Sequence, residues 1–213
     1  MSIRKQSGFT LIEIAIVLVI IGLLLGGVLK GQELINSARV KALSQDFRNV
    51  PTMIYGYQDR FRALPGDDRQ AVTHVTATAN GDGNGRIDGD WDTTTDNDET
   101  CLFWQHLRLG NFMAGSTAPA SCGLQQQNAA GGMMGIESAY TGHDAYIAGM
   151  RGTYLCSGGI LGNFVTQLDQ TMDDGDPATG SMRAVATGSA RGTAAVTAAN
   201  LDDATAYTVC LEI

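Results

Sequence analysis

The chain has few basic residues, and no lysine follows Lys41. From Arg62 to the C-terminus, 7 arginines stand against 18 acidic residues, which gives a net charge of −11. Proteins that bind nucleic acids neutralise the phosphate backbone with lysine and arginine. This part of the chain is therefore a poor nucleic-acid-binding surface.

The sequence also lacks the patterns that mark an enzyme. It contains no phosphate-binding glycine loop, and its serines, cysteines and aspartates show no arrangement typical of nucleophilic catalysis. The histidines His74, His106 and His143 are scattered and no C-x-x-C pair occurs, so zinc is weakly supported as a bound metal. We therefore expect no catalytic activity.

The most informative segment is the apolar run over residues 14–29, which contains no charged side chain. A stretch of about 20 apolar residues can span a bilayer. A cleaved secretory signal has a shorter apolar region, of about 7–15 residues, followed by a small-residue cleavage site. No such site follows this run. The segment is better interpreted as a membrane-spanning helix.

Charged residues flank this run at its N-terminal side. Arg4 and Lys5 favour an N-terminus held in the cytoplasm, which places the chain beyond the helix outside the inner membrane. Glu13 lies at the start of the apolar helix, where a carboxylate costs about 2.5–3.5 kcal/mol on insertion. We therefore expect Glu13 to have a specific partner.

The sequence G-F-T-L-I-E at residues 8–13, followed by the apolar run, resembles the leader and N-terminal helix of type IV pilins and of the related pseudopilins of type II secretion. The resemblance covers about the first 60 residues. It implies that residues 1–8 are a leader peptide that the prepilin peptidase removes after Gly8, and that Phe9 is then N-methylated. It also implies that Glu13 meets the N-terminal amine of a neighbouring subunit during filament assembly.

The resemblance implies a structural subunit of a type IV pilus, major or minor, that assembles into a helical filament with other pilin subunits. Its further partners would be the prepilin peptidase, the inner-membrane assembly platform and, before assembly, membrane lipid. A pseudopilin of a type II secretion system is the alternative. A membrane-anchored binding protein that never polymerises is a third possibility, against which Glu13 and the leader argue.

The helical pattern does not stop with the apolar run. Apolar residues continue at helical spacing through residues 30–62 with charged residues between them, and Pro65 and Gly66 then mark a stop. We expect an α+β, pilin-like fold. A long helix, with a membrane half at 9–29 and an amphipathic half at 30–62, would pack under a small antiparallel sheet in a soluble globular head formed by residues 63–213.

The predicted elements of the head are short and are separated by long loops. The patterns predict helices over 99–109 and 160–172, strands that include 146–148, 153–155, 182–187 and 206–213, and loops over 67–97, 123–132 and 188–199.

The four cysteines, Cys101, Cys122, Cys156 and Cys210, all lie in the head. An even number of cysteines beyond a membrane segment is typical of disulfides in an oxidising compartment. Four cysteines allow three pairings. We favour Cys101–Cys122 and Cys156–Cys210, because the second bond would tie the C-terminus to the domain.

An acidic loop is the best candidate for a ligand site in the head. Asn80, Asp82 and Asn84 stand at alternate positions, Gly85 follows, and Arg86 can offer its carbonyl, as at the start of an EF-hand loop. Calcium needs six to eight oxygens, so Asp88, Asp90 or Asp92 would have to contribute. The twelfth position, however, is Trp91 rather than a glutamate. The alternative is a solvated acidic loop, but its 7 acidic residues between Asn80 and Glu99 favour a cation.

Overall fold

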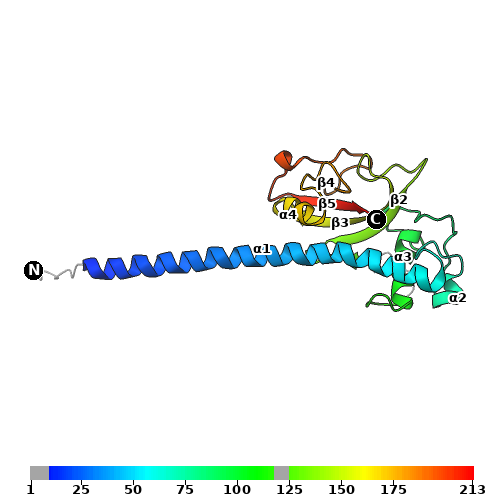
Figure 1. Ribbon diagram of the computed structural model, residues 1–213, viewed down its shortest axis with the longest axis horizontal. Coiled ribbons are helices and arrows are strands. Elements are labelled where there is room, and N and C mark those ends of the chain that lie inside the picture. Colours follow the sequence, from blue (N-terminus) through cyan, green and yellow to red (C-terminus); the bar gives the residue numbers. More distant parts are fainter. Residues whose placement is uncertain (1–9, 118–124) are drawn as a thin grey trace, which may run out of the picture. The chain divides into compact units, whose positions relative to one another are not determined.

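The computed structural model describes residues 10–117 and 125–213 (Figure 1). The chain divides into two compact units, residues 1–38 and residues 39–213. The second unit contains the predicted head together with the last part of the first helix, and we call it the head from here on.

Helix α1 (Leu11–Phe61) belongs to both units, and the other elements lie in the head. The helices of the head are α2 (Ala71–Val75), α3 (Glu99–Leu109), α4 (Gly162–Met172) and the 3-10 helix η2 (Ala198–Asn200), and its strands are β1 (Gln126–Gln127), β2 (Met133–Ala139), β3 (Gly152–Leu161), β4 (Met182–Ala186) and β5 (Ala206–Glu212).

In the N-terminal unit, α1 carries its apolar side chains uncovered. The large apolar residues of the run over 14–29 are all exposed. By length and composition, α1 is able to cross a membrane. Because exposed apolar surface is unfavourable in water, this part of α1 requires lipid or other helices around it.

In the head, α1 presents one buried apolar stripe. The buried side chains follow one another at steps of three and four residues, which puts them on one face of the helix: Val40, Leu43, Phe47, Val50, Ile54 and Tyr57. The helix continues through Pro51 and ends at Phe61, so the amphipathic continuation predicted over 30–62 is present.

The strands form one antiparallel sheet in the order β1-β2-β3-β5-β4. Alternate residues of the strands point to opposite faces, so Leu155 joins the large core with α1, α3 and α4, whereas Tyr154 and Cys156 join a second cluster on the other face. This second face is covered by loops, namely the loop that contains Trp91 and the 145–150 segment. The α+β prediction is confirmed (Figure 1).

Several of the predicted local assignments were wrong. For the 146–148 segment and for residues 160–161, tertiary contacts explain the difference. The 146–148 segment is not a strand, because Tyr146 and Ile147 pack on the loop-covered face and Ile147 forms only an isolated bridge with Thr193. Residues 160–161 end β3 rather than begin α4, because they pair with β5. The 67–97 loop contains α2, and the 123–132 loop contains β1.

The predicted Cys156–Cys210 disulfide is present. The two cysteines are direct register partners on β3 and β5, so the bond joins the C-terminal strand to the middle of the sheet. The predicted Cys101–Cys122 bond involves Cys122, which lies outside the described residues, and it stays a prediction.

His106 connects α3 to the chain that follows α1. Its ring is fully buried, its Nδ1 accepts a hydrogen bond from the Gly66 amide at 3.0 Å, and its Nε2 lies 3.3 Å from the Ala79 carbonyl oxygen. A neutral ring with its proton on Nε2 satisfies both neighbours. Burial lowers the pKa of His106 to about 4.

We expect acidification to destabilise the head through His106. An ordinary histidine takes up its proton near pH 6.5 and the folded one only near pH 4, so the unfolded state binds more protons between these values. The free energy of unfolding should therefore fall by up to about 3 kcal/mol from pH 6.5 to 4. Denaturant titrations of the full chain in detergent would measure it. His106→Gln should lose stability at neutral pH but show a shallower decline, and parallel pH curves for the two proteins would contradict this role.

Candidate functional site

The first candidate site is the N-terminal end of α1. The Thr10 amide and hydroxyl both donate to Glu13 Oε2, at 2.8 and 2.7 Å, and Thr10 Oγ1 lies 3.4 Å from the Glu13 amide. This reciprocal arrangement is a capping box, which satisfies amides that the first turn of a helix leaves free. Gly8 and Phe9, the predicted processing residues, lie outside the described residues.

Glu13 is thereby held in position at the start of the apolar helix. Among the ion pairs of residues 10–117 and 125–213, none includes Glu13, and its side chain is exposed. A carboxylate that is fixed in position but not paired with a cation is available to a positive group from outside the chain. Pairing with a neighbouring subunit's N-terminal amine stays a prediction.

The second candidate site is the acidic loop after α2. Asp82 accepts hydrogen bonds from the Asn84 amide at 2.9 Å and from Asn84 Nδ2 at 2.8 Å, and Asn84 Nδ2 also donates to Asp88 Oδ2 at 2.9 Å. Three of the predicted ligand residues are therefore brought together. Asn80 is bonded elsewhere, since its Oδ1 accepts a hydrogen bond from the Val72 amide at 2.9 Å.

Two carboxylates from outside the predicted pattern complete this loop. Asp67 accepts from the amides of Asn84 and Gly85, at 2.9 and 2.8 Å, and Glu99 accepts from those of Asp82 and Asp88, both at 2.9 Å. Carboxylate oxygens of Asp67, Asp82 and Glu99 lie within 4.8 Å of one another. The sequence hint to Asp67 was its place directly after the helix stop, whereas Glu99 gave no signal beyond starting a helix.

The remaining predicted residues of the loop have other contacts. The Arg86 guanidinium lies over the Tyr140 ring, 4.0 Å from its centroid, and Arg86 Nε is 3.5 Å from Asp88 Oδ1. Asp90 forms an ion pair with Arg191 and does not belong to the group formed by Asp67, Asp82 and Glu99. Ile87 is buried and exchanges hydrogen bonds with Ser138 of β2, each 3.0 Å long, which anchors the loop on the sheet.

The electrostatics of this loop suit a hard cation. Burial raises the pKa of Glu99 to about 7, with the nearby Asp67 and Asp82 charges adding to the shift, and burial also raises the pKa of Asp67. Grouped carboxylate oxygens without nitrogen or sulfur donors match Ca²⁺ better than Zn²⁺. Calcium binding by the loop stays a prediction, with Asp67 and Glu99 added to its candidate ligands.

We expect millimolar Ca²⁺ to raise the melting temperature of the full chain in detergent, and Asp82→Asn to reduce that rise. A cation at a hundred times its dissociation constant adds about 2.7 kcal/mol to the free energy of unfolding. Protons compete with cations for carboxylates, so the stabilisation should be larger at pH 8 than at pH 5.5. Asp203→Asn, at an exposed acidic position, is the matched control. Equal responses of the Asp82 and Asp203 variants would contradict the prediction.

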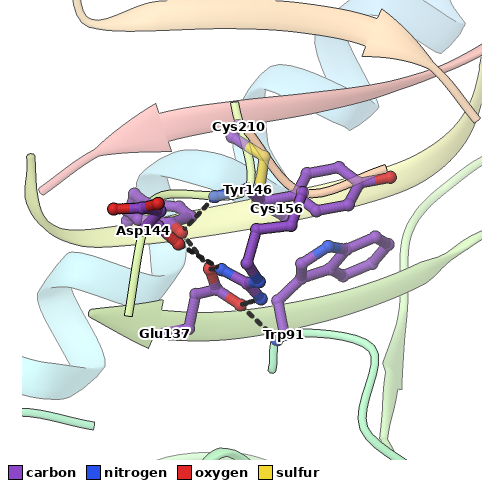
Figure 2. The surroundings of a disulfide bond; sticks show 8 residues. Trp91, Glu137, Asp144, Tyr146, Cys156 and Cys210 are labelled. Atoms are coloured by element: carbon purple, nitrogen blue, oxygen red, sulfur yellow. Dashed lines mark hydrogen bonds and ion pairs between the residues drawn. A yellow bond between two sulfur atoms is a disulfide. The ribbon is translucent and has the colours of Figure 1, made fainter. Parts of the chain in front are cut away.

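A buried ionic cluster on the other face of the sheet escaped sequence analysis. Glu137 of β2 is fully buried, and Arg191 donates to its two carboxylate oxygens at 2.7 and 2.9 Å. The Trp91 amide donates to Glu137 at 2.6 Å, and the Tyr154 hydroxyl also donates to it. Figure 2 shows Glu137 and Trp91 beside the Cys156–Cys210 bond. The ion pair fixes the alanine-rich 188–199 segment to the sheet, which is a structural role.

The comparisons with known proteins bear on the first site. A family model described as "Prokaryotic N-terminal methylation motif" matches residues 3–29. Neither the comparison with curated proteins nor that with solved structures gives a match. The matched residues include the capping box at Thr10 and Glu13 and the exposed apolar part of α1. The chain thus carries, at its N-terminus, the prepilin-type signal that type IV pilins and pseudopilins share.

Proposed function

We propose that this protein is a structural subunit of a type IV pilus. The observation that carries the proposal is an apolar helix that nothing in the described chain covers, within a prepilin-type signal. After prepilin peptidase removes residues 1–8 and the new N-terminus is methylated, residues 9–29 would pack against the same segments of neighbouring subunits. Before assembly, the same surface would lie in membrane lipid, which satisfies the same apolar side chains.

Glu13 would set the register between subunits in this filament. Its Oε2 already accepts two hydrogen bonds from Thr10, which restrict where the carboxylate can point. The methylated N-terminal amine of a neighbour would supply the missing positive charge. An unpaired carboxylate among apolar helices costs several kcal/mol, so only the register that forms this pair would be stable.

The positive leader supports a head outside the inner membrane. Arg4 and Lys5 would remain in the cytoplasm until cleavage, and the disulfide between Cys156 and Cys210 suits an oxidising compartment. The signal and the apolar helix are equally compatible with a pseudopilin, which forms a short periplasmic filament in type II secretion. The site of the finished filament separates the two.

We expect Glu13→Ala and Glu13→Gln to leave membrane insertion intact and to abolish most filament assembly. Glutamine keeps a hydrogen-bond acceptor for Thr10 but removes the charge, so it isolates the ion pair. Because breaking a buried pair costs about 3–5 kcal/mol, filament yield should fall by about a hundredfold or more. Glu33→Ala, which removes an exposed carboxylate that pairs with Lys30 on the same helix, is the control. Filament yields of the Glu13 variants equal to that of the control would refute the assembly role.

Mechanical shearing of living cells tests the choice between pilus and pseudopilus. A pilus subunit should be abundant in the sheared surface fraction, and its deletion should leave protein export unchanged. Retention in the cell envelope, together with loss of secreted proteins on deletion, would overturn the pilus proposal in favour of a pseudopilin.

A further inference from the structure

A second group of carboxylates lies where α4 ends and the chain turns toward β4. Asp169 is in the last turn of α4, and Asp173 and Asp174 follow the helix. Carboxylate oxygens of these three residues lie within 4.8 Å of one another. The group is separate from the acidic loop at Asp82 and shares no residue with it.

Asp169 is the unusual member of this group, because its side chain is fully buried and only half satisfied. Its Oδ1 accepts a hydrogen bond from the Gly175 amide at 2.6 Å. Its Oδ2 is buried too and has no hydrogen-bond partner among the described residues. A buried charged oxygen without a partner is costly, so such an atom in a folded protein needs a partner from outside the described chain, such as a water molecule or a cation.

The other two carboxylates are positioned by the turn. Asp173 Oδ2 accepts from the amides of Ser181 and Met182, at 2.6 and 2.9 Å. Asp174 accepts from the Asp176 amide at 2.9 Å and from the Thr179 hydroxyl at 2.7 Å. These hydrogen bonds hold the carboxylates of Asp173 and Asp174 close to Asp169.

The approach of Asp173 depends on a glycine. Gly180 has φ +67°, and a Cβ at this position would lie 2.0 Å from Asp173 Oδ2. Only a residue without a side chain therefore lets the Asp173 carboxylate reach the start of β4.

Within the described residues, no positive side chain is paired with this group. No ion pair within residues 10–117 and 125–213 includes Asp169, Asp173 or Asp174. The arginines at the edges of the turn are used elsewhere: Arg48 Nη2 donates to the Thr171 carbonyl at 3.2 Å, and Arg183 Nε donates to the Gly180 carbonyl at 3.3 Å. The three negative charges thus have no counter-charge from the described chain.

We propose that Asp169, Asp173 and Asp174 form a calcium site that joins the end of α4 to the start of β4. All the donors are oxygens, which a hard cation prefers, and Ca²⁺ tolerates an irregular set completed by carbonyls and water. Mg²⁺ requires a nearly regular octahedron, and Zn²⁺ prefers nitrogen and sulfur, so both fit less well. Asp169 Oδ2 is the buried ligand, and bound Ca²⁺ gives it the partner that the chain does not.

The test uses the full chain in detergent, stripped with a chelator, in an Asp82→Asn background that reduces the contribution of the acidic loop. Calorimetry and thermal melting with Ca²⁺ are then repeated after adding Asp169→Asn, Asp174→Asn or the control Asp203→Asn. We expect the background protein to bind Ca²⁺ and to melt about 5–10 °C higher at a hundred times its dissociation constant. Asp169→Asn should abolish the response, Asp174→Asn should weaken Ca²⁺ binding about tenfold or more, and Asp203→Asn should change neither.

Two results would overturn the site. One is a background protein that shows neither binding heat nor a rise in melting temperature with Ca²⁺, and the other is a set of variants that all bind as the Asp203 control does. If Asp169→Asn does not fold, Asp174→Asn decides the matter, because that side chain is exposed at the surface of the turn. Filament assembly is not measured, so the outcome is independent of the proposed pilus function.

Discussion

The apolar stripe of α1 between Val40 and Tyr57 is the contact on which the head is built. Its residues recur at steps of three and four, so one face of the helix is apolar along five turns of chain, and that face is buried in the main core. The sheet contributes one face to the same core. The other face of the sheet then needs its own cover, and loops around Trp91 and Ile147 provide it. The polar sites of the head lie in the segments that complete these two layers.

Those segments are organised by buried carboxylates rather than by regular secondary structure. These loops have few apolar residues to bury, and their backbone amides donate hydrogen bonds to the carboxylates of Asp67, Glu99 and Asp169. The Trp91 amide likewise donates a hydrogen bond to the Glu137 carboxylate. An acceptor with two oxygens can fix several amides at once, which suits long glycine-rich loops. The cost is concentrated negative charge, since the head has no lysine beyond Lys41.

The negative charge of these carboxylates is balanced by different partners in different parts of the head. Glu137 has Arg191, and Asp68 has the Tyr57 hydroxyl and His74 at 2.8 and 2.7 Å. Within the described residues, the carboxylates grouped around Asp82 and around Asp169 accept hydrogen bonds from backbone amides but have no lysine or arginine paired with them. Burial raises the pKa of Glu99, and repulsion from the neighbouring carboxylates adds to that shift. A hard cation is a chemically reasonable substitute for the missing basic side chains, because grouped carboxylate oxygens are the ligands that Ca²⁺ prefers.

The sequence by itself determined the features that depend on neighbours along the chain. Residues 8–13 and the apolar run identified the prepilin-type signal, helical spacing predicted α1 beyond the apolar run, and Gly110 closed α3 where the pattern ended. The tertiary structure decided what depends on distant contacts. Glu99 meets Asp82 across 17 positions and Arg191 meets Glu137 across 54, and neither pair shares a local pattern. Likewise, Asp169 lies within the helix predicted over 160–172, but its burial could not be predicted, because burial is set by what the rest of the chain places around a residue.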